Sequence, residues 1–155
     1  MRGAAVVILG ALGGAGCHEA RERTSGTARP TEGGDWTLVI DRCSPVHVDG
    51  QPGVSLKGAW NGARSEAAEV IAVVPRSGEA RSSSTAVYLP SDPREMLSAR
   101  ECSVYDVAVT PTGHQINDVE LVRGHARLEC RGFQSVRFTV DATFEDCGAH
   151  AFEGK

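Results

Sequence analysis

Two segments near the C-terminus constrain the fold most, because both alternate apolar and polar residues along their length. Residues 119–130 read VELVRGHARLEC, and residues 136–147 read VRFTVDATFEDC. A period of two residues is typical of a strand with one face buried and the other in water. The two segments therefore predict neighbouring antiparallel strands that cover one side of a core.

Joined as a hairpin over residues 131–135, the two segments favour a register in which Cys130 faces Val136. Apolar residues then face apolar residues on one side, while His125 faces Asp141 on the other. A slip of one residue would exchange the two faces, so we expect this register.

The chain from residue 35 to residue 118 continues in short apolar runs separated by Gly, Pro, Asp and Ser, a pattern typical of antiparallel β proteins. We predict a mainly β fold, either an antiparallel β sandwich or a curved sheet. The further strands are expected at 36–42, 54–60, 69–75, 85–90 and 102–110, with loops at 75–84 and 111–118.

One segment, SDPREMLSAR at 91–100, predicts a short helix instead. Asp92 can cap it, Pro93 suits the first helical position, and Glu95 follows three residues after the cap.

Four cysteines lie in this region, and four cysteines allow three pairings. In the hairpin above, Cys130 and Cys147 lie at opposite ends, roughly 36 Å apart at 3.3 Å per residue. A disulfide needs Cα atoms within about 7 Å, so this pair is excluded. Cys102 lies at the same end as Cys130, which predicts the disulfides Cys102–Cys130 and Cys43–Cys147.

The N-terminal stretch MRGAAVVILGALGGAGC has a positive start, a short apolar run and small residues before a break. The run is shorter than the about 20 residues of a membrane span, and its layout is that of a secretory signal. Ala15-Gly16-Cys17 resembles the lipobox of bacterial lipoproteins, although that family prefers Leu where this chain has Gly14.

The resemblance implies that residues 1–16 are removed and that Cys17 carries a lipid, a diacylglycerol thioether with a further acyl chain such as palmitate. It also implies a protein anchored in the bacterial cell envelope, in the outer rather than the inner membrane because His18, not Asp, follows the cysteine. Cleavage elsewhere, giving a secreted or periplasmic protein, is the alternative.

Residues 17–34 contain no large apolar side chain, so we expect them to form a flexible tether after the lipid attachment site. Residues 35–155 then form a single β-rich globular domain.

The formal net charge is −4 and the arginines are scattered, which argues against a nucleic-acid partner. The sequence contains no GxSxG, P-loop, SxxK or HExxH motif, and its histidine spacing indicates no metal site. We therefore expect no cofactor and assign no catalytic residue. Trp36 and Trp60 could form a ligand platform, but we expect them to cap the ends of the core.

The combined features predict a membrane-anchored envelope lipoprotein that acts as a non-catalytic binding or structural module. Its partner would be an envelope protein or a small ligand. One alternative is a carrier of a small apolar ligand held between sheets. Another is a hydrolase whose site forms only in three dimensions, with His47, His125 and Asp141 as candidates.

Overall fold

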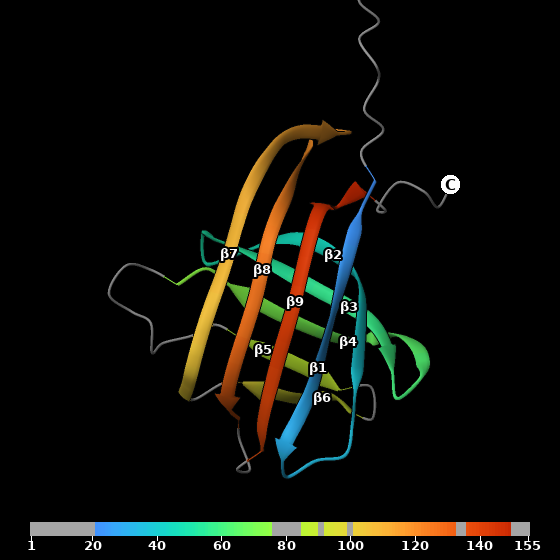
Figure 1. Ribbon diagram of the computed structural model, residues 1–155, viewed down its shortest axis with the longest axis vertical. Coiled ribbons are helices and arrows are strands. Elements are labelled where there is room, and N and C mark those ends of the chain that lie inside the picture. The colour runs from blue at the N-terminus through green and yellow to red at the C-terminus, as the bar shows by residue number, and fades with distance from the viewer. Residues whose placement is uncertain (1–20, 76–84, 90–91, 99–100, 133–135, 150–155) are drawn as a thin grey trace, which may run out of the picture.

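The protein folds as one antiparallel β-sheet, which confirms the mainly β prediction (Figure 1). The computed structural model describes residues 21–75, 85–89, 92–98, 101–132 and 136–149, and no helix occurs in these ranges. The strands are β1 (Arg23–Glu32), β2 (Leu38–Val48), β3 (Gln51–Trp60), β4 (Ala63–Val73), β5 (Ala86–Leu89), β6 (Asp92–Ser98), β7 (Glu101–Ile116), β8 (Val119–Arg131) and β9 (Arg137–Cys147).

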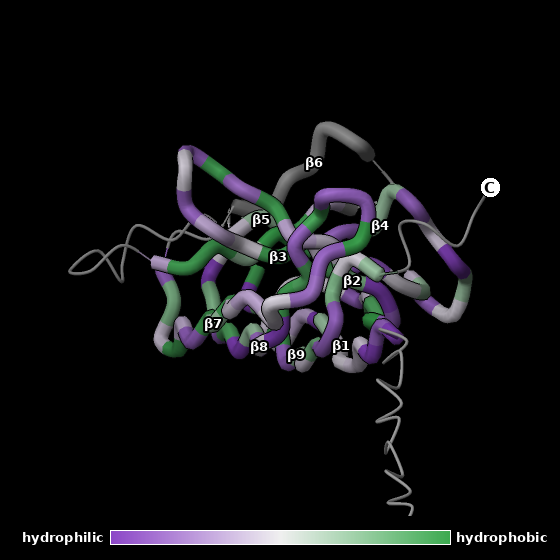
Figure 2. Tube along the Cα trace, turned by 90° about the horizontal axis from the view of Figure 1, so that it is seen from above, coloured by the Kyte–Doolittle hydropathy of each residue, from purple (hydrophilic) through white to green (hydrophobic). Residues whose placement is uncertain are grey.

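The sheet curls so that its two halves pack against each other. The strand order is β6-β5-β4-β3-β2-β1-β9-β8-β7, with all neighbouring strands antiparallel. Seen along the strands, β7, β8, β9 and β1 form one layer, which we call the front layer, and β3 to β6 form the layer behind it (Figure 2). β2 joins the layers, since it pairs with β1 through Leu38–Ile40 and with β3 along its length.

The core lies between these two layers. Alternate residues of β8 and β9 point into it, and the largest of them, Phe138, is 1% exposed. Leu38 and Ile40 of β2 and Leu56 of β3 meet them in the same cluster. The alternation in the sequence therefore decides which side of each strand faces the core.

The β8–β9 hairpin forms in the predicted segments, but its register differs from the prediction by two residues. Cys130 faces Phe138 rather than Val136, and His125 faces Thr143 rather than Asp141. A shift of two leaves every residue on the same face, so the alternation of apolar residues cannot distinguish the two registers. A bulge between Val122 and Gly124 changes the pairing once more.

The expected tether at 17–34 is wrong for most of its length, because Arg23–Glu32 forms β1 in the middle of the sheet. β1 pairs with β9 over most of its length and with β2 at Gly26 to Ala28. Its core-facing residues are small, and a Cβ on Gly26 would lie 2.4 Å from the Asp141 carbonyl oxygen. Small side chains suit a strand pressed between two others, and they give no apolar signal in the sequence.

The predicted helix at 91–100 is also wrong, since Asp92–Ser98 forms β6 and pairs with β5. β6 is the last strand of the sheet, where Pro93 is tolerated because only one side of the backbone pairs. The loop expected at 111–118 is largely strand, because β7 continues to Ile116 with a bulge after Pro111. Most of the loop expected at 75–84 lies outside the described residues.

Both predicted cysteine pairs lie at disulfide distance. Cys102 of β7 faces Cys130 of β8, with Cα atoms 3.9 Å apart. Cys43 of β2 and Cys147 of β9 have Cα atoms 5.4 Å apart, although β1 lies between these two strands in the sheet. This second bridge therefore joins the two neighbours of β1 beside the point where β1 begins.

The open side of the curled sheet is bridged by a side chain. The Tyr105 hydroxyl of β7 donates to the Val73 carbonyl oxygen of β4 at 2.7 Å and accepts from the Thr85 hydroxyl at 3.1 Å. Burial raises the pKa of Tyr105, and these hydrogen bonds offset part of that effect. The phenol thus holds the edge strand β7 against the opposite layer.

Candidate functional site: a polar depression on the front layer

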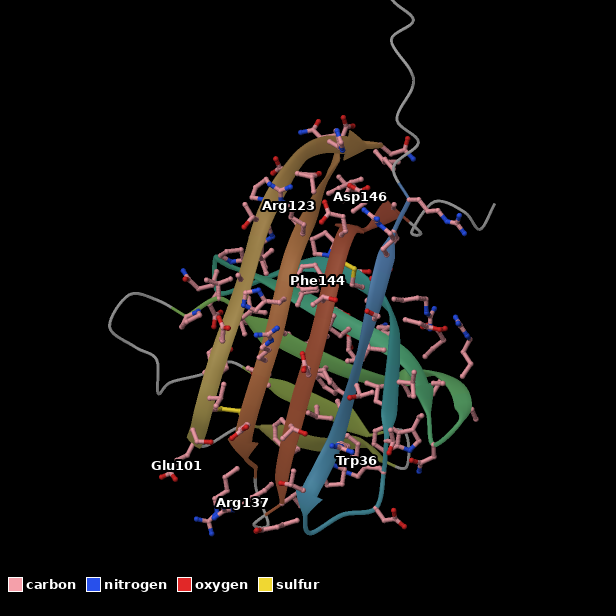
Figure 3. The ribbon with its side chains drawn as sticks, in the orientation of Figure 1. Trp36, Glu101, Arg123, Arg137, Phe144 and Asp146 are labelled. Carbon is pink, nitrogen blue, oxygen red and sulfur yellow. A yellow bond between two sulfur atoms is a disulfide. The ribbon has the colours of Figure 1, made fainter. Side chains whose placement is uncertain are left out.

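The outer face of the front layer carries a broad, shallow depression of about 1000 Å³. It extends over five adjacent strands, β2, β1, β9, β8 and β7, from the start of β1 towards the middle of the sheet. It is lined by Glu22, Arg23, Thr24, Ser25, Asp41, Ala108, Thr110, Arg123, Gly124, His125, Arg127, Thr143, Phe144 and Glu145. Arg123 lies near the end of the molecule where β1 begins, and Phe144 lies nearer the middle (Figure 3).

The strand alternation explains why these side chains gather on one face. The odd-numbered residues of β1, of β8 from Arg123 onwards and of β9 up to Glu145 point away from the core, while their even-numbered neighbours point towards it. The pairing then places Ser25, Thr143 and His125 in one row across three strands. Extended strands hold such a row at fixed spacing, so the polar groups need little ordering when a partner binds.

The depression mixes charges of both signs in pairs. Arg123 Nη1 lies 4.0 Å from Glu145 Oε1, and Arg127 Nε lies 3.7 Å from Asp141 Oδ1. These pairs are well exposed, so each contributes little to stability. Their effect is to present guanidinium and carboxylate groups side by side, which suits a partner with both donors and acceptors.

The floor of the depression is made of small side chains. Gly124 is required there, because a Cβ at this position would lie 1.8 Å from the Ala108 carbonyl oxygen. A bulge lies next to Gly124 in β8, and Ala108 and Phe144 approach it closely.

The three residues considered for a hydrolase are not brought together. His125 Nε2 lies 2.9 Å from Asp106 Oδ1, while Asp141 contacts Arg127. His47 is exposed near the end of β2 and does not line the depression. The partner Asp106 was missed in the sequence because it lies on β7, and only the pairing of β7 with β8 shows which β7 residue can reach His125.

A hydroxyl nucleophile next to His125 would need a hydrogen bond to the imidazole. Ser25 Oγ and Thr143 Oγ1 lie 3.5 Å from each other, and within the described residues neither hydroxyl bonds to His125. All four described cysteines are in disulfides, so this part of the chain offers no thiolate. The row is therefore a polar surface rather than a nucleophile with its base.

A second depression of about 410 Å³ lies at the opposite end of the front layer. It includes Glu101, Glu129 and two arginines, Arg131 and Arg137, which face each other across β8 and β9. The Arg137 guanidinium nitrogen Nε lies 3.3 Å from Glu32 Oε2. Glu101 and Arg137 mark this end in Figure 3.

The two tryptophans stack on each other, with ring centroids 5.0 Å apart. Trp36 is 9% exposed and Trp60 packs against the core cluster, so they cap the core at the end opposite the start of β1. Both therefore lie at one end of the core rather than at its two ends, and Trp36 presents little surface to a ligand.

The described part of the chain contains no group of three His, Cys, Asp or Glu residues that could hold a metal ion. Across residues 21–149, the placed segments include no helix long and apolar enough to cross a membrane. Cys17 and the signal expected at residues 1–16 lie outside the described residues.

Comparison with protein-family models, with curated proteins and with solved structures found no match.

Proposed function

We propose that the chain is an envelope lipoprotein, anchored through Cys17, whose β domain is a non-catalytic module that binds a polar partner in the depression on the front layer. The observation that carries this proposal is the row of paired charges and hydroxyls fixed across β1, β9 and β8. The anchor rests on the lipobox-like Ala15-Gly16-Cys17 and the signal before it.

The composition of the depression favours a partner rich in hydrogen-bonding groups, such as the polar surface of another envelope protein. Protein interfaces have a polar, solvent-accessible rim and are enriched in arginine. The depression is also wide and shallow, whereas a small-molecule site is normally concave and mostly apolar.

The carrier alternative gains no support from the two depressions described. An apolar ligand needs an apolar chamber, but charged side chains line both. In addition, the core between the layers is filled by close-packed side chains of a single cluster. We therefore place the binding site on the outer surface and not between the layers.

Site-specific crosslinking in cells tests the binding site. A photo-reactive residue at the exposed position Thr143 should yield one dominant crosslinked species. Arg123→Glu should reduce its yield about tenfold or more, the effect expected when a charged contact of about 1.4 kcal/mol is lost.

Arg137→Glu is the matched control. Arg137 is 55% exposed and paired with a glutamate, as is Arg123 at 57%, but it lies at the other end of the face. Equal loss in both variants, or no loss in either, would contradict the proposed site. Turnover of an ester or peptide that disappears in His125→Ala would instead favour the hydrolase.

The anchor is tested separately by intact mass. The protein purified from membranes should begin at Cys17 and carry the mass of the lipid, and Cys17→Ser should release it from the membrane fraction. A chain with an unmodified Cys17 thiol would refute lipidation and leave the binding site to be judged on its own.

A further inference from the structure

Hydrogen bonds hold the chain in place at Glu22, five residues after the proposed lipid attachment site. The Glu22 carboxylate accepts a hydrogen bond from the Cys43 amide at 2.8 Å and another from the Thr24 hydroxyl at 3.1 Å. These bonds fix the entry of the chain beside the Cys43–Cys147 disulfide. The tether from Cys17 to Glu22 is thus five residue steps, not the whole segment 17–34.

Five steps reach about 18 Å when fully extended, at about 3.5 Å per residue. The 10 residues of β1 extend about 33 Å along the front layer at about 3.3 Å per residue. A lipid on Cys17 therefore cannot enter a bilayer while the opposite end of the domain, with Trp36, rests on that bilayer. The start of β1 must be the end nearer to the lipid.

The side chains at this nearer end oppose insertion into the bilayer. Acidic residues outnumber arginines here, and none of the described large apolar side chains classed as exposed lies on it, since these are Val39 and Val104. The acidic residues are Glu22, Asp118, Glu120, Glu145 and Asp146, and the arginines are Arg21, Arg23 and Arg123. The net negative charge of this end is repelled by an anionic lipid surface within about 8–10 Å at physiological salt.

Lying flat is also disfavoured. The outer face of the front layer carries exposed ion pairs such as Arg127 with Asp141, and contact with the lipid would remove these charges from water at a large cost in free energy. The upright arrangement leaves that face in water.

We propose, resting on the anchor given under the proposed function, that the domain stands on the membrane on the end that holds Glu22 and the β7–β8 turn. The stacked Trp36 and Trp60 then mark the distal end. The polar depression opens sideways, beginning close to the bilayer surface, and its partner is a protein that lies at that surface.

Energy transfer from tryptophan to dansyl-labelled lipid tests this orientation. The lipidated protein is purified as cells process it, its mass is checked, and it is placed in phosphatidylcholine vesicles. The native tryptophans should transfer weakly. Ile116→Trp, at the β7–β8 turn, should add an energy-transfer signal several-fold stronger than that of the native tryptophans. Val119 is the cross-strand partner of Ile116, so Val119→Trp replaces the first variant if that variant does not fold.

The matched control lengthens the tether. A flexible insertion of about 20 Gly and Ser residues before Glu22 should abolish most of the excess signal from Ile116→Trp, because such a linker spans about 25 Å on average. The native tryptophans should be little affected.

Two outcomes would overturn the proposal in distinguishable ways. If the mass shows the lipid but the native tryptophans transfer as strongly as the variant tryptophan, the orientation is wrong and the anchor stands. If the mass shows no lipid, the anchor fails and the orientation fails with it.

Discussion

β1 and β9 lie side by side in the sheet and pair over most of their length, yet they enter the fold for different reasons. β9 points Phe138, Val140 and Phe144 into the core, so hydrophobic burial holds it. β1 contributes Ala28 as its only fully buried side chain among the described residues, and it is held by backbone hydrogen bonds to both neighbours. A strand without an apolar pattern can therefore occupy the middle of a sheet when its neighbours are already fixed.

The largest effect should come from removing the apolar anchor of β9. Phe138→Ala should destabilise the protein by about 3–5 kcal/mol, because it deletes a fully buried ring and leaves a cavity. Chemical denaturation followed by circular dichroism measures this. Arg29→Ala on β1 is the control and should change the stability by less than about 0.5 kcal/mol.

Removing the Cys43–Cys147 disulfide beside β1 should have the next largest effect on stability. Cys43→Ser with Cys147→Ser removes the link between its two neighbours and should cost about 2–4 kcal/mol. Hydrogen exchange should accelerate first in the amides of β1, while the β8–β9 hairpin stays protected. Equal acceleration in β1 and β8 would show that the bridge does not act on β1 in particular.

In β1, an added methyl group should destabilise the protein more than the loss of an outward-pointing side chain. Gly26→Ala introduces a methyl group 2.4 Å from the Asp141 carbonyl oxygen, and the forced separation of β1 from β9 should cost about 1–3 kcal/mol. Thr27→Ala, whose side chain points outwards, is the neighbouring control. A thermal melt of both variants checks the difference, and similar melting temperatures would disprove the close approach.

The edge strand β7 differs from β1, because it has only one neighbouring strand in the sheet. Its Tyr105 side chain contacts the opposite layer. Tyr105→Phe should cost about 1–2 kcal/mol through the unsatisfied partners it leaves.

The pH dependence of Tyr105 has a definite sign. The folded state raises the pKa of this phenol, so its contribution to stability is complete below pH of about 10 and is lost as the pH rises through the folded pKa. The stability of the wild type should therefore fall more steeply than that of Tyr105→Phe in this alkaline range. Urea unfolding across the range measures this, with Tyr88→Phe as the control; parallel curves would contradict it.

The sequence predicted most of the strands and both disulfides correctly, because alternation and turn residues are local signals. The prediction from sequence was wrong where apolar alternation was weak or where local helix propensity favoured the wrong element. The helix expected at 91–100 has sound capping residues, but in the folded chain this segment pairs with β5 as the edge strand β6. Propensity is a weak prior, and tertiary contacts override it.

The candidate site was less predictable than the fold. His125 was identified, but the partner assigned to it was Asp141, and the observed neighbour is Asp106. The error follows from a hairpin register that is wrong by two residues, which keeps every face but changes every cross-strand pair. Side-chain rows across four strands depend on all the registers together.

By itself, the sequence determined most of the strand-forming segments, the buried face of those strands and the pairing of the four cysteines. The physical reason is that a period of two and a disulfide both act over short, fixed distances. Only the tertiary structure decided that Arg23–Glu32 is a strand, which residues meet on the front layer, and how short the segment after Cys17 is. These features depend on residues that are distant in the chain. A segment of small polar residues has no apolar alternation from which its strand neighbours could be predicted.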